Sequence, residues 1–337
     1  MRSDHRLPSC VFGSFAVSVL YLNREDVATI GLSMPVIIDA VENMFREKGE
    51  GRVEMPPKPG IHTQPDAFIH AMPAYIPSLG AAGVKWISGY PGNQAKGLPY
   101  ITGLLILNDP ETGVPTAIMD ATWLTAQRTG AATAVAARYL ARPDSSTAGI
   151  IACGVQGRSN LQALASIFSL SKVWAYDRRR DVATTFATEM ADSLQLQIEV
   201  VDEPRAAVVN ADLVVTSGPI LKAPTPVIDV DWLAPGAFAS PVDFDSYWTG
   251  AALHQADKLA TDDIAQLDHY REAGYFGDTP EPYADLGQIV AGHRPGRESR
   301  DERIISINLG LALEDIATAM PIYQRALELG IGTRLPL

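Results

Sequence analysis

The sequence lacks the features that mark several large classes of protein. Only two of its 337 residues are cysteine, Cys10 and Cys153, too few for a disulfide framework in so long a chain. Acidic residues number 39 against 27 lysines and arginines, and the longest basic run is three arginines, at 178–180. Because nucleic-acid binding needs a concentrated basic face, we expect no nucleic-acid partner, and the few cysteines favour a reducing, cytoplasmic compartment.

Long apolar runs are also missing. The run over residues 10–22 follows two arginines, as in a signal peptide, but glycine and serine interrupt it. Its end, SVLYLN, predicts a β-strand that leads into a helix over 24–29. No stretch reaches the ~18 uninterrupted apolar residues of a membrane-spanning helix, so we expect a soluble protein without a membrane partner.

Motifs of metal binding and of cofactor-free catalysis are absent as well. The sequence contains no C-x-x-C, H-E-x-x-H, G-x-S-x-G or phosphate-loop G-K-[ST]. His62 and His70 are the only two histidines close together, and no cysteine or carboxylate joins them at ligand spacing. We therefore expect no metal site.

Two patterns of secondary structure divide the chain. Up to about residue 120, the sequence predicts a helix after Ser33 and then short strands, the last two joined as a hairpin by DPETG. After an alanine-rich helix, strands and helices alternate, which predicts an α/β fold with a Rossmann-type doubly wound parallel sheet. We assign this sheet to 130–303. Residues 1–129 and 304–337 would together form an α+β domain for substrate binding and dimerisation.

The stretch AGIIACGVQG, residues 148–157, is similar to a dinucleotide-binding turn. Ala152, Gly154 and Gly157 stand at the three glycine positions of G-x-G-x-x-G, with alanine in the first. An apolar strand precedes the turn, and a helix follows whose N-terminus would hold a pyrophosphate. The alternative is an ordinary α/β turn without a ligand.

Polar residues at later strand ends favour nucleotide binding. Asp177 ends the strand VWAYD at the distance from Gly157 where a ribose-binding carboxylate belongs. It favours NAD, whereas the adjacent arginines leave NADP possible. The strand ADLVVTSG ends in small polar residues suited to the nicotinamide ribose. The predicted cofactor site comprises Gly154, Val155, Gln156, Gly157, Asp177, Arg178, Thr216 and Ser217.

Hydride transfer also needs a cation for a substrate carboxylate and an acid–base group. Lys85 lies between apolar residues in GVKWISG and is either paired structurally or holds an anion. Arg128 stands near the start of an alanine-rich helix, where the helix dipole disfavours a cation, so a ligand carboxylate would explain it. Asp245, in SPVDFDSYW, is either a general base or a solvated loop carboxylate.

Taken together, these stretches resemble the ornithine cyclodeaminase/mu-crystallin family. The segments that carry the resemblance are GVKWISGYPGN, GLLILNDPETGVPTAIMDATWLTAQRTGAATAVAARYLA and the glycine turn, and it extends from MPAY to LGLALEDIA. The resemblance implies a nicotinamide cofactor at the glycine turn and a homodimer. It also implies that Lys85 lies beside the substrate carboxylate and the reacting centre as a catalytic and binding residue, and that Arg128 holds that carboxylate. Asp245, or failing it Asp243, would be the acid–base residue.

The chain departs from ornithine cyclodeaminases at two positions. His70 stands where they have a glutamate, and Lys58 where they have an arginine. A site with Lys58, His70, Lys85 and Arg128 suits a neutral or anionic substrate side chain. We therefore expect NAD-dependent dehydrogenation or imine reduction of a small α-amino or α-imino acid. The alternatives are ornithine cyclodeamination with recycled NAD, a non-catalytic mu-crystallin-like binding protein and a structural subunit.

Overall fold

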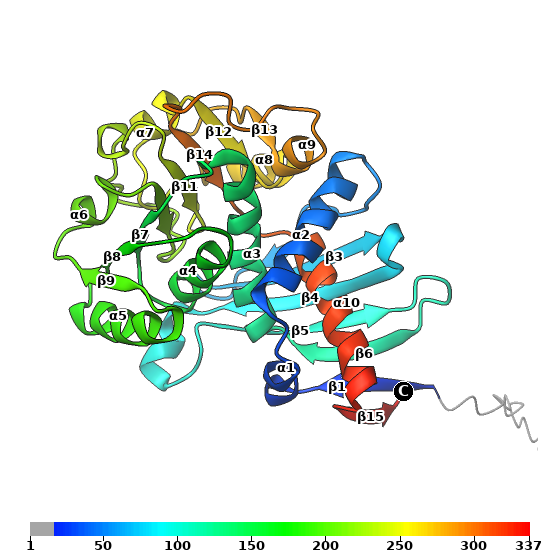
Figure 1. Ribbon diagram of the computed structural model, residues 1–337. Helices are drawn as coiled ribbons and strands as arrows, with labels where there is room; N and C mark the ends of the chain where they lie inside the picture. Colours follow the sequence, from blue (N-terminus) through cyan, green and yellow to red (C-terminus); the bar gives the residue numbers. More distant parts are fainter. Residues whose placement is uncertain (1–16) are drawn as a thin grey trace, which may run out of the picture.

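The computed structural model describes residues 17–337, so Cys10 and the start of the N-terminal apolar run lie outside it. Within these residues the strands form two sheets, each covered by helices (Figure 1). Sheet A has seven strands in the order β15-β1-β6-β5-β4-β3-β2, and sheet B has eight in the order β13-β12-β14-β11-β10-β7-β8-β9. The predicted α/β fold is confirmed.

Sheet A and its helices take up most of the first 140 residues. The elements are β1 (Ser18–Leu22), α1 (Arg24–Ile30), α2 (Met34–Gly49), β2 (Gly60–Ile61), β3 (Phe68–Ile76), η1 (Pro77–Leu79), β4 (Ala81–Gly89), η2 (Pro91–Lys96), β5 (Ile101–Asn108), β6 (Pro115–Asp120) and α3 (Thr122–Leu140). The predicted strand and helix at 18–30 are present, and Asn23 begins α1 with a capping box. The predicted hairpin is β5 and β6, which pair antiparallel.

Sheet B follows, and all its strand pairs are parallel. Its elements are β7 (Thr147–Ile151), α4 (Val155–Ile167), β8 (Lys172–Tyr176), α5 (Arg180–Leu194), β9 (Gln197–Val200), α6 (Pro204–Val208), β10 (Leu213–Thr216), η3 (Val230–Trp232), β11 (Phe238–Pro241), α7 (Gly250–Gln255), β12 (Lys258–Thr261), α8 (Ile264–Glu272), β13 (Ala284–Asp285), α9 (Leu286–Val290) and β14 (Ile304–Ile307). Strands β10, β11, β12 and β14 are buried throughout. Strand order reverses between β7 and β10, and ligands of such sheets bind at the carboxyl ends beside this point.

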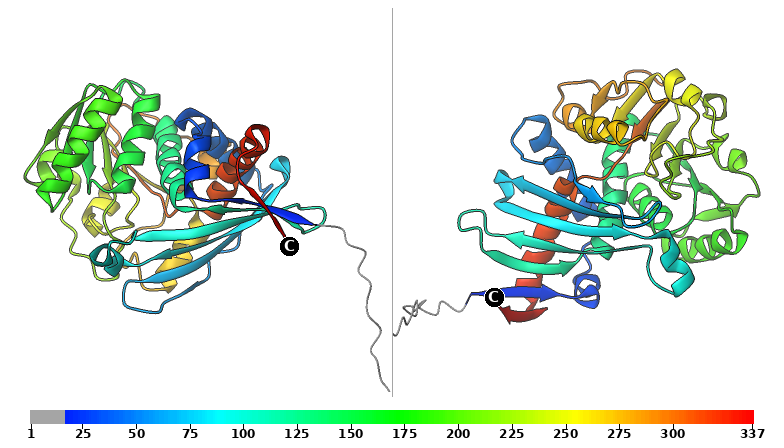
Figure 2. Two further views of the ribbon diagram at one scale, coloured as in Figure 1. Left: turned by 90° about the horizontal axis from the view of Figure 1, so that it is seen from below. Right: turned by 180° about the vertical axis from the view of Figure 1, so that it is seen from behind.

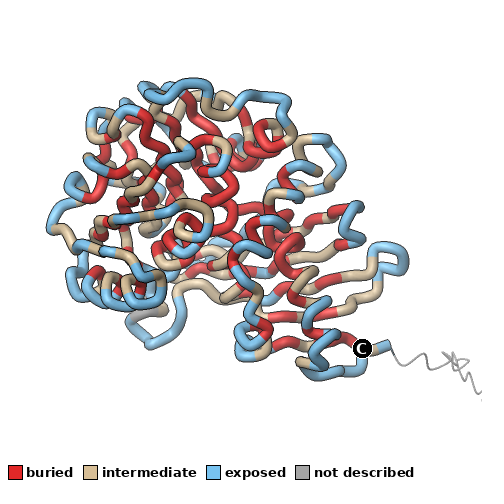
Figure 3. Tube along the Cα trace, viewed as in Figure 1, coloured by how far each residue is buried: buried red, intermediate tan, exposed pale blue. Residues whose placement is uncertain are grey.

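The chain passes between the sheets twice. Helix α3 leads from sheet A to sheet B, and the segment after β14 leads back to α10 (Ala312–Leu329) and β15 (Thr333–Pro336). Both connecting segments run through the buried centre of the molecule (Figure 3). Helix α10 packs against α2, α3 and the strands β3 and β4. Side chains on these segments can therefore contact elements of both sheets.

Helices cover one face of sheet A only. Figure 2 shows α10 on one side of the sheet, and among the described residues no helix lies on the other. On the uncovered face Trp86 and Leu104 are opposite each other in the β4–β5 register, with 50% and 44% of their surfaces exposed. Within residues 17–337 no single helix is long and apolar enough to cross a membrane; only α1 and α2 taken together are, and they meet at 97°.

Candidate active site

The glycine turn joins β7 to α4 at the point where the strand order reverses. Ala152 has a φ of 69°, in the left-handed region that favours glycine. A Cβ added at Gly154 would meet no heavy atom within 4 Å, whereas one at Gly157 would lie 2.6 Å from the carbonyl oxygen of Ala152. The turn therefore has the tight bend, the open approach and the close helix–strand packing of a dinucleotide-binding turn.

Asp177 and Ser217 both bond to the backbone of this turn. The carboxylate of Asp177 accepts hydrogen bonds from the amide of Cys153 and from that of Arg179, each at 2.9 Å. The hydroxyl of Ser217 donates to the carbonyl oxygen of Ala152 at 2.8 Å. The ends of β8 and β10 are thus fixed to the turn between them, which brings these predicted cofactor residues together.

The other predicted cofactor residues differ in exposure. Those with surface free for a ligand are Gln156, Arg178 and Val155, the last with 66% of its surface exposed. Thr216 is instead fully buried: its hydroxyl donates to Asp243 at 2.7 Å and accepts from the indole N–H of Trp248 at 3.1 Å. Thr216 was expected to contact the cofactor, but its hydroxyl forms hydrogen bonds with buried side chains of the protein.

The predicted substrate residues belong to a buried cluster of charged side chains where β4, α3 and the start of α10 meet. Lys85, on β4, is fully buried, and its Nζ donates to Asp315 Oδ1 at 2.6 Å and to Thr125 Oγ1 at 3.4 Å. Arg128, on α3, donates from Nε to the same Asp315 oxygen at 2.9 Å and from Nη1 to Glu314 Oε2 at 2.8 Å. Both carboxylates lie in the first turn of α10, where the helix dipole stabilises negative charge.

Lys58 joins the cluster from the proline-rich segment before β3. Its Nζ donates to the carbonyl oxygens of Leu309 at 2.9 Å and Gly310 at 3.0 Å, and it lies 5.1 Å from the centroid of the Tyr270 ring. The amide of Gly310 donates to Asp262 Oδ2 at 2.7 Å. The segment between β14 and α10 is therefore held by Lys58, from the segment before β3, and by Asp262, after β12.

Burial changes the acidity of these cations. Burial, reinforced by the charge of Arg128, lowers the pKa of Lys85 to about 7, and burial lowers the pKa of Lys58 to about 8. Burial also acts to lower the pKa of Arg128, but Asp315 and Glu314 outweigh it, and the pKa rises. Both lysines can thus exchange protons near neutral pH, whereas the arginine stays charged.

His70 lies on the same face of sheet A as Lys85. Lys85 is opposite Met72 in the β3–β4 register, so His70 is two residues along β3 with its side chain on the same side. Its ring stacks on Phe68 with centroids 4.3 Å apart. Burial and the nearby charge of Lys58 lower the pKa of His70 to about 3, which keeps the imidazole neutral.

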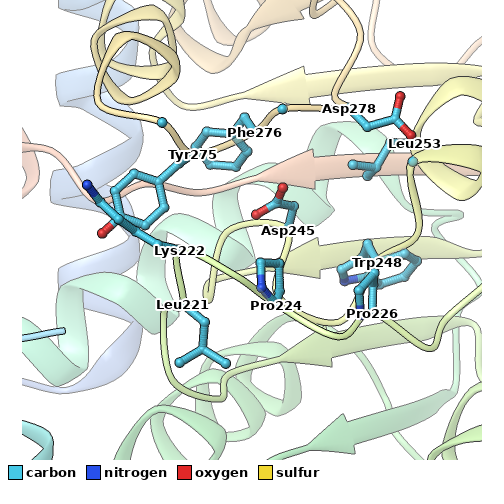
Figure 4. A pocket seen from close by; sticks show the side chains of 13 residues that line it. Leu221, Lys222, Pro224, Pro226, Asp245, Trp248, Leu253, Tyr275, Phe276 and Asp278 are labelled. Carbon is cyan, nitrogen blue, oxygen red and sulfur yellow. The ribbon is translucent and has the colours of Figure 1, made fainter. Parts of the chain in front are cut away.

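The two candidate acid–base aspartates after β11 have different surroundings. Asp243 is fully buried, and its two oxygens accept from the Thr216 hydroxyl and from the amide of Gly218, both at 2.7 Å. Burial raises its pKa to about 7. Asp245 lines a cavity of about 380 Å³, and burial raises its pKa as well (Figure 4). Between them, Phe244 has a φ of 62°, rare for a bulky residue, which turns the backbone sharply.

The cavity around Asp245 was not predicted from the sequence. Figure 4 shows its walls, formed by aromatic, proline and charged side chains that include Lys222, Pro224, Pro226, Trp248, Tyr275 and Phe276. Within the described part of the chain, no side chain donates a hydrogen bond to the Asp245 carboxylate. The residues of the charged cluster are not part of its lining, so the cavity and the cluster are separate features.

Sequence analysis also missed the carboxylates of the charged cluster. Asp262, Glu314 and Asp315 are all fully buried, yet none was singled out. The available signal was the pair of acidic residues in LGLALEDIA, adjacent to each other in an otherwise apolar helix start. Buried carboxylates need cationic partners, so this pair could have been matched with Lys85 and Arg128.

Comparison with known proteins gives consistent matches along the chain. A sequence model of the ornithine cyclodeaminase/mu-crystallin family matches residues 19–330. An alanine dehydrogenase of Archaeoglobus fulgidus is 36% identical over 332 residues, 95% of this chain and 98% of that protein. The structure of Thermococcus litoralis Δ1-pyrroline-2-carboxylate reductase with NADH and L-proline has a TM-score of 0.86 at 34% identity and covers 94% of this chain and 100% of that one. An archaeal alanine dehydrogenase dimer with bound NAD has a TM-score of 0.85 at 34% identity, covering 95% and 100%.

Proposed function

Because the chain belongs to the ornithine cyclodeaminase/mu-crystallin family, we propose that it transfers hydride between NAD and the α-carbon of a small α-amino or α-imino acid. The family resemblance inferred from the sequence is confirmed. The observation that carries the proposal is the combination of an open glycine turn at the start of α4 with three buried cations, one of which, Arg128, lies on α3, the helix that packs against α4. The glycine turn suits a dinucleotide, and the buried cations suit a carboxylate.

The glycine turn fits the cofactor. The free amide groups at the start of α4 would bind the pyrophosphate, and the space beside Gly154, which a Cβ would partly fill, leaves room for it. Asp177 would accept from the ribose hydroxyls, which favours NAD over its 2′-phosphorylated form. Bound NAD supplies the hydride acceptor or donor. The protein supplies the orientation of both reactants.

The charged cluster binds the substrate carboxylate in this proposal. Arg128 uses Nε and Nη1 for Asp315 and Glu314, and within residues 17–337 its Nη2 makes no hydrogen bond. The guanidinium thus keeps donors for a carboxylate, while Lys58 and Lys85 add positive charge. Neutral His70 offers no counter-charge to a side-chain amine. A substrate with an uncharged side chain therefore suits the site better than ornithine, whose cyclodeamination is the alternative.

We assign proton transfer to Asp243 in preference to Asp245. Asp243 bonds to Gly218 and Thr216, next to Ser217 and the glycine turn, and its pKa of about 7 suits exchange near neutral pH. Asp245 faces a cavity that is separate from the cluster. Proton transfer requires Asp243 to release one of its two hydrogen bonds, so that an oxygen reaches the substrate nitrogen.

The matched variants Asp243→Asn and Asp245→Asn test the assignment. Turnover is followed by NADH absorbance, with amino acids and NAD in one direction and oxo acids plus ammonia, or cyclic imines, in the other. We expect kcat to fall by about 10²–10⁴-fold in Asp243→Asn and by less than ~tenfold in Asp245→Asn, with NAD affinity kept in both.

The reverse ranking of the two variants would return the acid–base role to Asp245. A wild-type protein that binds NAD but turns over none of these acids would overturn the oxidoreductase proposal and favour a binding protein. Ammonia released from ornithine without net NADH change would instead indicate a cyclodeaminase.

The uncovered face of sheet A supports a homodimer, and we place the enzyme in the cytoplasm. Trp86 and Leu104 expose large apolar surfaces there, and a related alanine dehydrogenase is a dimer. The low cysteine content is the basis for the compartment. Light scattering after chromatography should give twice the chain mass, and Trp86→Glu with Leu104→Glu should give monomers. A monomeric wild type would contradict the dimer.

A further inference from the structure

The buried cluster contains equal numbers of cations and carboxylates. Its members are Lys58, Lys85, Arg128, Asp262, Glu314 and Asp315, each at most 8% exposed. With all six ionised their net charge is zero. A substrate carboxylate would add a negative charge that no seventh member offsets among the described residues, and an uncompensated buried charge is costly. Binding therefore favours the uptake of a proton by the cluster.

Glu314 is the carboxylate with the fewest partners. Asp315 Oδ1 accepts from both Lys85 and Arg128, and Asp262 accepts from the backbone amide of Gly310 and from the Thr261 hydroxyl. Glu314 has a single partner, Arg128, on Oε2. Its Oε1 is buried without a hydrogen-bond partner in the described structure, as is Asp315 Oδ2, but Asp315 is held by two cations. A proton on Glu314 thus costs the fewest charge-assisted hydrogen bonds.

We propose that Glu314 takes up one proton from solvent when the substrate carboxylate binds, so that the substrate replaces Glu314 as a counter-ion of Arg128. The new O–H bond forms at Oε1, and Oε2 remains an acceptor for Arg128. The inference rests on the proposed function, because it needs a carboxylate at Arg128. Glu314 is a positioning residue here, since it acts through the arginine.

The charges that face Glu314 determine whether its pKa rises or falls. Burial raises the pKa of Glu314; Arg128, from α3, opposes this, and the carboxylates of Asp262, after β12, and Asp315, on the same helix, add to it. Lys58, from the segment before β3, interacts with all of them, and Lys85, from β4, bonds to Asp315. A further anion at Arg128 raises the pKa again, so the complex holds a proton that the free protein lacks in alkaline solution.

The sign of the pH effect separates this role from a purely structural one. Once Glu314 is ionised in the free protein, each binding event draws a proton from solvent, so affinity should fall about tenfold per pH unit. In Glu314→Gln the side chain is neutral at every pH, so the contribution of Glu314 to the pH dependence should be lost and affinity should fall less steeply than in the wild type. At pH 8.5 the variant should therefore bind a carboxylate more tightly than the wild type, whereas structural damage would weaken binding.

The experiment is isothermal titration calorimetry of the NADH-saturated protein with propionate at pH 8, in phosphate and in Tris. These buffers differ in ionisation enthalpy, so the difference in heat gives the number of protons taken up. We expect about one proton per propionate in the wild type and about zero in Glu314→Gln. Glu302→Gln is the matched control: like Glu314, Glu302 pairs with a cation, here Lys258 at 3.2 Å, but outside the cluster, and it should behave as wild type.

Each of the other possible results of the calorimetry contradicts one specific statement. Uptake that persists in Glu314→Gln would assign the proton to another group, such as Lys85. Propionate binding without uptake in the wild type would overturn the inference and leave the proposed carboxylate site intact. Failure of propionate to bind the wild type at all would overturn the carboxylate site itself, and with it the inference.

Discussion

The two halves of the proposed site, the glycine turn as cofactor half and the charged cluster as substrate half, provide for negative charge by different means. At the glycine turn, the groups available to a ligand are backbone amides of a few consecutive residues, 154–157, at the start of α4. In the charged cluster they are side chains from segments far apart in the sequence, and Arg128 and Asp315 are 187 positions apart. The first arrangement is local and uncharged. The second exists only in the complete fold, and its cations need permanent counter-ions.

Breaking the ion pairs of the substrate half should have the largest effect on stability. Arg128→Met leaves Glu314 and Asp315 buried with Lys85 alone, and we expect the free energy of unfolding to fall by about 3–5 kcal/mol. Urea denaturation measures it. The control is Arg325→Met, whose pair with Glu328 is 50% and 62% exposed and should contribute less than ~1 kcal/mol. Equal losses in both proteins would contradict the burial of the cluster.

In the cofactor half, two alanine substitutions three residues apart should separate stability from binding. Gly157→Ala puts a methyl group 2.6 Å from the Ala152 carbonyl oxygen and should lower the free energy of unfolding by about 1–3 kcal/mol. Gly154→Ala meets nothing within 4 Å, so stability should change by less than ~0.5 kcal/mol. It should nevertheless weaken NAD binding at least ~tenfold in a fluorescence titration. Unchanged NAD affinity would place the cofactor elsewhere.

The substrate half should also show an acid sensitivity that comes from His70. The imidazole of His70 has a pKa of about 3 in the folded protein and 6.5 in the unfolded chain. Between these two pH values the ring is protonated in the unfolded chain and neutral in the folded protein. Stability is therefore lost as pH falls from 6.5 toward 3. From pH 7 to pH 5 the wild type should lose about 2 kcal/mol more than His70→Asn, in urea titrations at both values. Parallel losses in the two proteins would mean that His70 is protonated in the folded state.

The smallest expected effect is a gain. Ala152 has a φ of 69°, which costs an alanine roughly 1 kcal/mol and a glycine little. Ala152→Gly should therefore raise the free energy of unfolding by about 0.5 kcal/mol, once the greater freedom of glycine in the unfolded chain is included. Ala187→Gly, inside α5, is the matched control and should lose about 1 kcal/mol, seen as a lower Tm. Destabilisation by both would mean that the strain at Ala152 is negligible.

The sequence was sufficient for those parts of the structure that depend on neighbouring residues. The hairpin of β5 and β6, the alternation of strands and helices in sheet B and the glycine turn all have local signals, and each is present. It was not sufficient for the partners of Lys85, because the nearness of Asp315 depends on how α10 returns to sheet A. The inward direction of the Thr216 hydroxyl likewise depends on a tertiary contact.

The two aspartates after β11 show the same limit at close range. Asp243 and Asp245 are two residues apart, and a regular strand would place both on one side. Phe244, at a φ of 62°, changes that geometry, and phenylalanine is not a residue from which a left-handed conformation is predicted. The sequence therefore named Asp245 before Asp243, and it contained no signal for the different surroundings of the two carboxylates.

The return of the chain to sheet A also determines when each half can form during synthesis. Lys85 and Arg128 leave the ribosome long before Glu314 and Asp315, and at 5–20 residues per second the intervening segment takes roughly 10–40 s to make. The time between the synthesis of strand β1 and that of β15, its antiparallel neighbour, is longer still. Sheet B, by contrast, is continuous in sequence. A nascent chain that has emerged only as far as β14 would thus have every strand of sheet B, while Lys85 and Arg128 still lack the carboxylates of Glu314 and Asp315.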